Sequence, residues 1–217
     1  MPPRVRTVQF FCAMAVCLVS RLAAASQSPG SEQLDFMVLK DGAPIGHHHI
    51  DVIRDGDDVT VSVKTEIVVT VAYVPVYSFK YDGKEIWRSG RLISLRSTAN
   101  DDGERHNLFV VASGDHLDIQ NEDGGSTADP RIMPATLWNP EVTKQSVLLN
   151  PQTGKPMQIS VADLGEESIT TRRGPLKTHH FKVSGDLERD VWYAPDGKLV
   201  QIRFKARDDS SIQYVLS

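Results

Sequence analysis

Three consecutive histidines, His47, His48 and His49, are the first residues whose type and spacing could support chemistry. Neutral imidazole is a common metal ligand, and a catalytic zinc site uses three protein ligands. In an extended strand, successive side chains point to opposite faces. His47 and His49 would therefore share one face and could supply two ligands, whereas His48 would point into the core.

The sequence favours an ordinary strand over a metal site at these histidines. A third ligand would have to come from another part of the chain, and His106, His116 and His180 are the imidazoles available for that role. No spacing motif connects any of them to His47 and His49. We therefore predict no metal and no other cofactor, and keep a metal-dependent hydrolase using His47 and His49 as an alternative.

The signatures of several common enzyme classes are missing from the sequence. It contains no G-x-S-x-G nucleophile elbow, no H-E-x-x-H zinc motif, no phosphate-binding glycine loop and no dinucleotide fingerprint. A catalytic group assembled by the fold would leave no local signature. The sequence therefore does not decide whether the protein is an enzyme, although the missing motifs favour one that is not.

A second group of candidate residues combines tryptophans with charged side chains: Glu85, Trp87, Arg88, Arg91 and Trp138. The tryptophans could line a groove, where the two arginines would offer paired donors to a carboxylate or phosphate. The plainer interpretation makes the tryptophans core anchors and pairs Glu85 with one arginine as a structural clasp. We favour the plainer one, because aromatic burial alone accounts for the tryptophans.

The first 25 residues have the features of a secretory signal peptide. Arg4 and Arg6 precede an uncharged apolar run, Val8–Val19, and Ala23-Ala24-Ala25 forms a small-residue cleavage site before Ser26. The apolar run is too short to span a bilayer, which takes about 20 residues. We therefore expect an exported protein, periplasmic or secreted, with no transmembrane segment after cleavage and a single domain over residues 26–217.

Cleavage at that site would leave an acidic chain without cysteine. Both cysteines, Cys12 and Cys17, lie within the signal, so the mature chain would have neither disulfides nor thiolate ligands. Removing the three arginines of residues 1–25 leaves 21 basic residues against 28 acidic ones, a net charge of −7. The absence of a basic tract argues against binding to nucleic acid. The sequence does not specify the oligomeric state.

Alternating apolar and polar residues predict an all-β fold. The longest alternation, Val59–Val71, is typical of a half-buried strand, and Val200–Ala206 repeats the pattern. Shorter alternations cover Leu34–Lys40, His106–Ala112, His116–Gln120, Gln158–Val161, Lys177–Val183 and Ile212–Leu216. Asp-Gly turns separate most of these runs, at Asp41, Asp55, Asp82, Asp102, Asp123 and Asp196.

This strand–turn order predicts one antiparallel meander of roughly ten strands that forms an open or partly closed β-barrel. A two-sheet β-sandwich is the alternative. The stretch Glu122–Gln145, rich in Gly, Pro and Asp, is predicted to be a long loop with one helical turn.

Short motifs spread over the chain resemble a family of exported bacterial proteins, domain of unknown function 6134. The motif E-x-W-x-x-G-R-L is present as Glu85–Leu92, followed by the turn Asn100–Gly103. Further matches are Gly42–Gly46, Pro134–Asn139, Asp190–Tyr193 before Gly197, and Ser211–Tyr214. The resemblance implies an exported single-domain protein and attaches no activity to it. A more distant likeness, of fold alone, is to open β-barrel envelope proteins that carry or sense lipids.

Three classes of function are consistent with these observations. The one we favour is a binding module that holds an apolar or amphipathic ligand, such as a lipid-like molecule, in an open barrel. The hydrolase at His47 and His49 is the second. The third is a structural scaffold that pairs through a free strand edge.

Overall fold

The computed structural model describes residues 30–171 and 174–217. The predicted signal peptide, residues 1–25, lies outside the described residues. Strands β1 to β8 occupy Gly30–Lys40, Ala43–Asp55, Asp58–Val71, Val74–Arg88, Arg91–Asp101, Glu104–Ser113, His116–Asn121 and Gly124–Ala128. Strands β9 to β15 occupy Met133–Pro134, Val147–Leu149, Pro156–Thr171, Gly174–Gly185, Arg189–Tyr193, Leu199–Lys205 and Ser211–Leu216, and a short 3-10 helix, η1, covers Pro140–Lys144.

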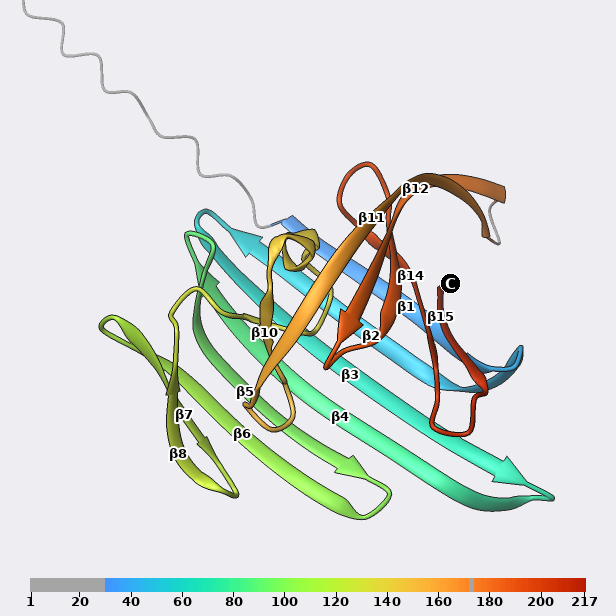
Figure 1. Ribbon diagram of the computed structural model, residues 1–217, viewed down its shortest axis with the longest axis horizontal. Coiled ribbons are helices and arrows are strands. Elements are labelled where there is room, and N and C mark those ends of the chain that lie inside the picture. Colours follow the sequence, from blue (N-terminus) through green and yellow to red (C-terminus); the bar gives the residue numbers. More distant parts are fainter. Residues whose placement is uncertain (1–29, 172–173) are drawn as a thin grey trace, which may run out of the picture.

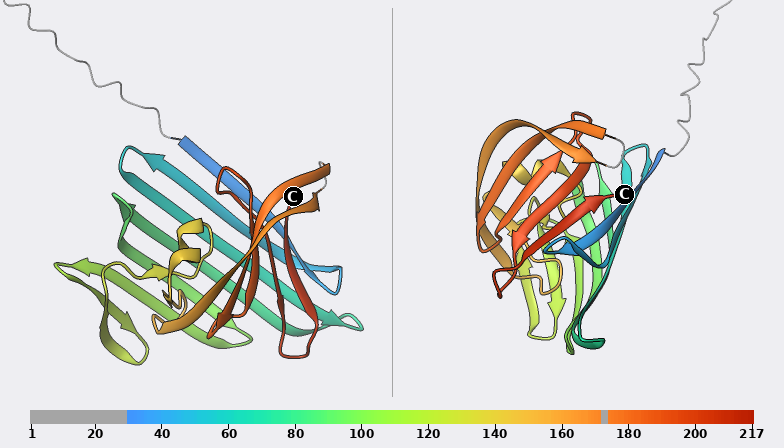
Figure 2. Two further views of the ribbon diagram at one scale, coloured as in Figure 1. Left: turned by 45° about the horizontal axis from the view of Figure 1, so that its top comes forward. Right: turned by 90° about the vertical axis from the view of Figure 1, so that its right-hand side faces the viewer.

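The fifteen strands of the described residues belong to one sheet, in the order β8-β7-β6-β5-β4-β3-β2-β1-β15-β14-β13-β12-β11-β10-β9. Neighbouring strands are antiparallel except β9 and β10, which are parallel. The first and last strands pair in the middle of the sheet, with Phe36 opposite Leu216. The described strands form no closed ring, because β8 and β9 are the two edges. Strands β1 to β8 make a broad twisted wall, and β11 to β15 curve over one side of it (Figures 1 and 2).

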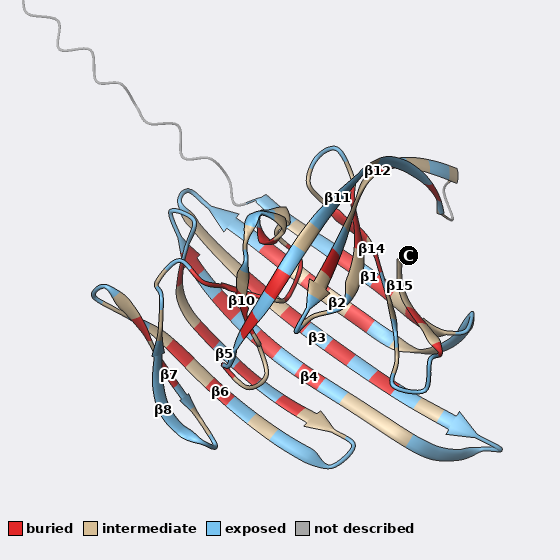
Figure 3. Cartoon of the chain, viewed as in Figure 1, coloured by how far each residue is buried: buried red, intermediate tan, exposed pale blue. Residues whose placement is uncertain are grey.

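The core fills the space between the wall and the curved strands. Alternate residues of β3 and β4 point into this space, which appears as alternating buried and exposed bands along the strands (Figure 3). The inward side chains include the fully buried Ile50, Val61, Leu95, Val110, Leu117 and Val191. Burying this apolar surface is the main favourable contribution to folding.

The predicted all-β antiparallel meander with an incompletely closed barrel is confirmed, and the strands form one continuous sheet rather than the two of a sandwich. The predicted number of strands, roughly ten, was too low. The loop predicted over Glu122–Gln145 contains β8 and β9, and its one helical turn is present as η1. The short or glycine-rich strands β8 to β10 leave almost no alternation to detect.

One predicted turn was wrong. Asp82-Gly83 lies inside β4, where Gly83 pairs with Val63 on one side and Ser97 on the other. A side chain at Gly83 would collide with the phenol of Tyr81, because its Cβ would lie 2.3 Å from the Tyr81 hydroxyl oxygen. This glycine therefore makes room for an aromatic ring and does not form a turn.

Candidate functional site

A buried carboxylate organises one end of the barrel. Glu85 and Trp87, two residues apart in β4, both point into the core. Glu85 is only 1% exposed and accepts three hydrogen bonds. The indole nitrogen Nε1 of Trp87 donates to Oε2 at 2.7 Å, and that of Trp138 donates to the same oxygen at 2.9 Å. The hydroxyl of Thr136 donates to Oε1 at 2.6 Å.

No cation balances this carboxylate among the described residues. Burial raises the pKa of Glu85 above its ordinary value, and the hydrogen bonds from Thr136, Trp138 and Trp87 oppose that rise. The predicted clasp between Glu85 and an arginine was wrong. Arg88 points outward and makes two hydrogen bonds to Asp58, at 2.7 and 3.0 Å. Outward orientation follows from the alternation of β4, because Arg88 is an odd number of residues from Glu85.

The segment between β9 and η1 carries two of the three donors, and its backbone is held in a special conformation. Leu137 has a positive φ of 62°, which is costly for a bulky residue. The hydroxyl of Tyr193 donates to the Leu137 carbonyl oxygen at 2.8 Å. The side chain of Asn139 accepts from the Glu141 backbone N–H and caps η1. Both contacts keep Thr136 and Trp138 aimed at Glu85.

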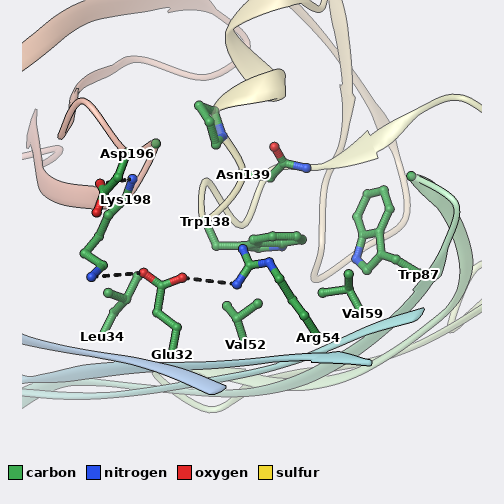
Figure 4. A pocket seen from close by; sticks show the side chains of 13 residues that line it. Glu32, Leu34, Val52, Arg54, Val59, Trp87, Trp138, Asn139, Asp196 and Lys198 are labelled. Atoms are coloured by element: carbon green, nitrogen blue, oxygen red, sulfur yellow. Dashed lines mark hydrogen bonds and ion pairs between the residues drawn. The ribbon is translucent and has the colours of Figure 1, made fainter. Parts of the chain in front are cut away.

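The two tryptophans meet edge to face, with ring centroids 5.9 Å apart and an interplanar angle of 78°. Both indole N–H groups are directed at Glu85. The remaining ring surface of Trp87 and Trp138 is hydrocarbon, and part of it lines a pocket (Figure 4). The tryptophans are therefore core anchors and pocket walls at the same time.

The pocket has a volume of about 340 Å³ and lies beside the Glu85 cluster. Its apolar lining consists of Leu34, Val52, Val59, Trp87, Trp138 and Pro140. The polar lining consists of Glu32, Arg54, Asn139, Asp196 and Lys198, with Gly90 and Gly197 completing it. A pocket of a few hundred Å³ with an apolar wall and a few polar groups is typical of a small-molecule site.

Charged side chains cross the mouth of this pocket. Arg54 Nη1 lies 3.2 Å from Glu32 Oε2, and Lys198 Nζ lies 3.3 Å from Glu32 Oε1 (Figure 4). Two cations therefore share one carboxylate. Asp196 is turned toward its own loop, where it accepts from the Lys198 backbone N–H at 3.1 Å. The mouth can consequently offer positive charge to an incoming group.

Trp87 and Trp138 are the two sequence-predicted candidates that line the pocket, while Glu85 lies behind them. Arg88 and Arg91 are exposed and are not part of its lining. Sequence reasoning missed Thr136, Glu32, Arg54 and Lys198. Only Thr136 left a signal, because it lies two residues before Trp138 as Glu85 does before Trp87.

The three histidines lie as the strand pattern predicts. His48 is buried, with Nδ1 2.7 Å from the hydroxyl of Thr65, while His47 and His49 point to the other face. His49 contacts Asp35 and also Asp51, the latter at 2.8 Å. Across residues 30–171 and 174–217, no three His, Cys, Asp or Glu side chains are grouped in a way that could hold a metal ion.

The other histidines considered as third ligands make separate contacts. His106 lies 3.4 Å from Glu104, and His116 lies between Asp115 and Asp118. The ring of His180 contacts Glu167 and Asp190 and stacks on Trp192. Each of these imidazoles is thus engaged away from His47 and His49.

A second depression, of about 740 Å³, lies over β4 to β7. Its lining is mostly polar, namely Asp82, Lys84, Arg96, Ser97, Thr98, Asn107, Gln120, Asn121 and Glu122, with Leu108 and Phe109. It lacks the paired tryptophans and the buried carboxylate. The pocket beside Glu85 is therefore the stronger candidate.

Comparison with known proteins gives one family and one similar structure. The family model described as domain of unknown function DUF6134 matches residues 36–217. A solved structure, the crystal structure of a β-barrel-like protein of domain of unknown function DUF1849 from Brucella abortus, is similar with a TM-score of 0.61 at 8% sequence identity. The similarity covers 87% of this chain and 95% of that one, and at this identity it shows the fold alone.

The search of curated proteins returned no match. Within the described part of the chain, no helix has the length and apolar character needed to cross a membrane.

Proposed function

Starting from the fact that this chain belongs to the DUF6134 family, we propose that it is an exported binding module for a small amphipathic ligand. The observation that carries the proposal is the pocket beside Glu85, which combines apolar walls with a charged mouth. The proposed location is the periplasm, which follows from the signal-like residues 1–25.

The chemistry of the walls indicates the body of the ligand. Leu34, Val52 and the ring surfaces of Trp87 and Trp138 offer apolar contact, and both indole N–H groups are already occupied by Glu85. An aliphatic or aromatic body would displace water from these surfaces, which is favourable in proportion to the area covered.

The chemistry of the mouth indicates the head of the ligand. Arg54 and Lys198 share Glu32, so an anionic head could take over contacts that this one carboxylate makes at present. Arg54 is also suited to bind a carboxylate, sulfonate or phosphate through two parallel hydrogen bonds. We therefore propose a ligand with an apolar body and one anionic group.

Two fluorescent probes with similar aromatic bodies test this proposal. 1-Anilinonaphthalene-8-sulfonate carries an anion, whereas N-phenyl-1-naphthylamine is neutral. The double variant Arg54→Gln/Lys198→Gln should weaken binding of the sulfonate by about tenfold or more, which corresponds to about 1.4 kcal/mol. It should change binding of the neutral probe much less. Trp138→Leu should weaken both probes, because it alters the wall.

Arg88→Gln is the matched control, because Arg88 is an exposed, carboxylate-paired arginine outside the pocket. Equal affinity of the sulfonate for wild type, the double variant and Trp138→Leu would contradict the proposal. Separately, a native mass spectrum of the wild-type protein purified from its own envelope would identify the natural ligand by its mass.

A further inference from the structure

The joined ends of β3 and β4 form an exposed apolar hairpin. Ile67–Phe79 is a run of thirteen residues without a charge. Every residue from Thr70 to Val76 is exposed, and Tyr73 at the turn is 98% exposed. Figure 1 shows this end extending beyond the neighbouring hairpins, and Figure 3 shows it in the colour of exposed residues. Exposed apolar surface concentrated in one place is typical of an interaction site.

The apolar side chains of this hairpin lie on both of its faces. Val71 and Val74 pair directly across the turn and therefore share one face, on which they are both 60% exposed. Val68, which pairs with Ser78, is three residues before Val71 in β3, so it points to the other face, where it is 44% exposed. A protein groove covers one face of a strand pair, whereas acyl chains surround an inserted segment on all sides.

The turn residues also depart from the usual chemistry of a tight turn. Ala72 and Tyr73 have φ values of 47° and 67°, in the left-handed region that favours glycine or asparagine. The neighbouring hairpins place Gly42, Gly90 and Gly103 at positive φ. Only the β3–β4 turn among these places a large aromatic ring there. The strain is consistent with a function of the ring outside the fold.

Charges begin where the apolar run ends, and they are paired. Lys80 lies 3.8 Å from Glu66, and Lys64 lies 3.6 Å from Asp82. Next to the apolar run, the hairpin therefore presents neither a basic patch nor a net charge. The five residues of β3 beyond Glu66 reach about 16 Å at the rise of an extended strand. An interfacial segment buries about 5–10 Å into the boundary between headgroups and acyl chains.

We propose that this hairpin end docks on a lipid bilayer by inserting Val71, Tyr73 and Val74 into the interface. Tyrosine suits this boundary, because its ring is apolar and its hydroxyl can remain hydrated. The attraction is apolar and not electrostatic, so it does not require anionic lipid. The ligand pocket is lined by Trp87 and Gly90, at the end of β4 opposite to the hairpin. The mouth of the pocket therefore stays free when the hairpin is docked. The inference does not depend on the proposed ligand.

Flotation of the exported protein with phosphatidylcholine vesicles, with and without phosphatidylglycerol, tests this docking. Wild type should bind both kinds of vesicle to a similar extent. Tyr73→Asp should lower the partition coefficient by about tenfold or more, because a charge must then enter the interface. Ile53→Asp is the matched control: Ile53 is an exposed apolar strand residue elsewhere, and its change adds the same charge. All variants share the same residues before Gly30, so that segment contributes equally.

A second variant separates binding from folding. Ala72→Asn/Tyr73→Gly supplies the residues that the turn prefers and removes the ring, so it should bind vesicles several-fold more weakly while its melting temperature stays equal or rises. The proposal is overturned if wild type binds neither vesicle, or if Tyr73→Asp binds as well as Ile53→Asp. It is also overturned if wild type forms a concentration-dependent dimer that Tyr73→Asp abolishes and that excludes vesicles, because a second copy would then cover the hairpin.

Discussion

Glu85 and His48 are both buried ionisable side chains on the inner face of the same sheet, and their surroundings differ. Glu85 accepts three hydrogen bonds, from Thr136, Trp87 and Trp138. His48 has one partner, the Thr65 hydroxyl, and its Nε2 has no hydrogen-bond partner within the described structure. Aromatic rings flank His48, with the centroid of Phe36 at 5.6 Å and that of Tyr214 at 5.2 Å.

Burial shifts the pKa of an acid and the pKa of a base in opposite directions. Burial favours the neutral form of each group, so it raises the pKa of Glu85 and lowers the pKa of His48 to about 4. Repulsion from His49 is a smaller second cause that also lowers the pKa of His48. Two of the three donors to Glu85, Trp87 and Trp138, also form a wall of the pocket. His48 has one hydrogen bond, to Thr65, and is otherwise surrounded by packed side chains that line neither of the two pockets. We infer that the first cluster is connected with function and the second with the core.

The largest effect is expected from Trp87→Ala. It removes a ring that is 4% exposed and one of the donors to the buried Glu85 carboxylate. Such a truncation of a large aromatic residue should cost about 3–5 kcal/mol of unfolding free energy. Urea unfolding measures this cost. Arg91→Ala, which changes an exposed side chain next to the same motif, should stay within about 0.5 kcal/mol of wild type.

A cost below about half a kcal/mol for Trp87→Ala would show that Trp87 is not an anchor. The Glu85 cluster would then not organise this end of the barrel, and its contrast with His48 would disappear.

His48 should make the protein sensitive to acid. Its pKa falls from 6.5 in the unfolded chain to about 4 in the folded one, so the unfolded state binds more protons between these values. The stability is therefore fully present above pH 6.5 and is lost as the pH falls toward 4, by about 3 kcal/mol in total. Urea unfolding at a series of pH values measures this slope.

The double variant His48→Leu/Thr65→Val isolates that contribution, because it removes the imidazole together with the hydroxyl that would lose its partner. Its stability should fall less steeply than that of wild type between pH 6.5 and 4. Equal slopes would mean that His48 is protonated in the folded core at no cost, and the interpretation of His48 as packing would fail.

Sequence patterns predicted the barrel well, because it follows from local alternation. The faces of β3 and the inward direction of His48 and Ile50 needed only the period of a strand. The same rule, applied to Glu85, would have placed it inside with Trp87 and placed Arg88 outside. The clasp with an arginine was therefore avoidable from the sequence.

The way in which the other residues of the candidate site come together in space was not predictable. Thr136 and Trp138 lie about fifty residues from Glu85, and an irregular segment with a positive φ at Leu137 brings them to it. No period or turn motif specifies that path. Arg54, Glu32 and Lys198 meet because β1 and β2 pass the turn between β13 and β14, which depends on how far the curved strands reach over the wall.

The smallest and most specific effect is expected from Glu85→Gln. Its carbonyl oxygen can accept from Trp87 and Trp138 as Oε2 does, and its amide group can donate to the Thr136 hydroxyl, so the cluster is retained without the charge.

The pKa of Glu85 is raised above 4.5 in the folded state, so the folded state binds more protons above pH 4.5. The contribution of Glu85 to wild-type stability is consequently fully present below pH 4.5 and is lost as the pH rises through the folded pKa. The loss is about 1.4 kcal/mol for each pKa unit of the rise. The stability of Glu85→Gln relative to wild type should therefore increase from pH 4 upward and then level off, and His48 cancels because both proteins contain it. A difference that stays constant with pH, or that falls, would show that the three donors outweigh burial and that Glu85 is held as a carboxylate in the folded state.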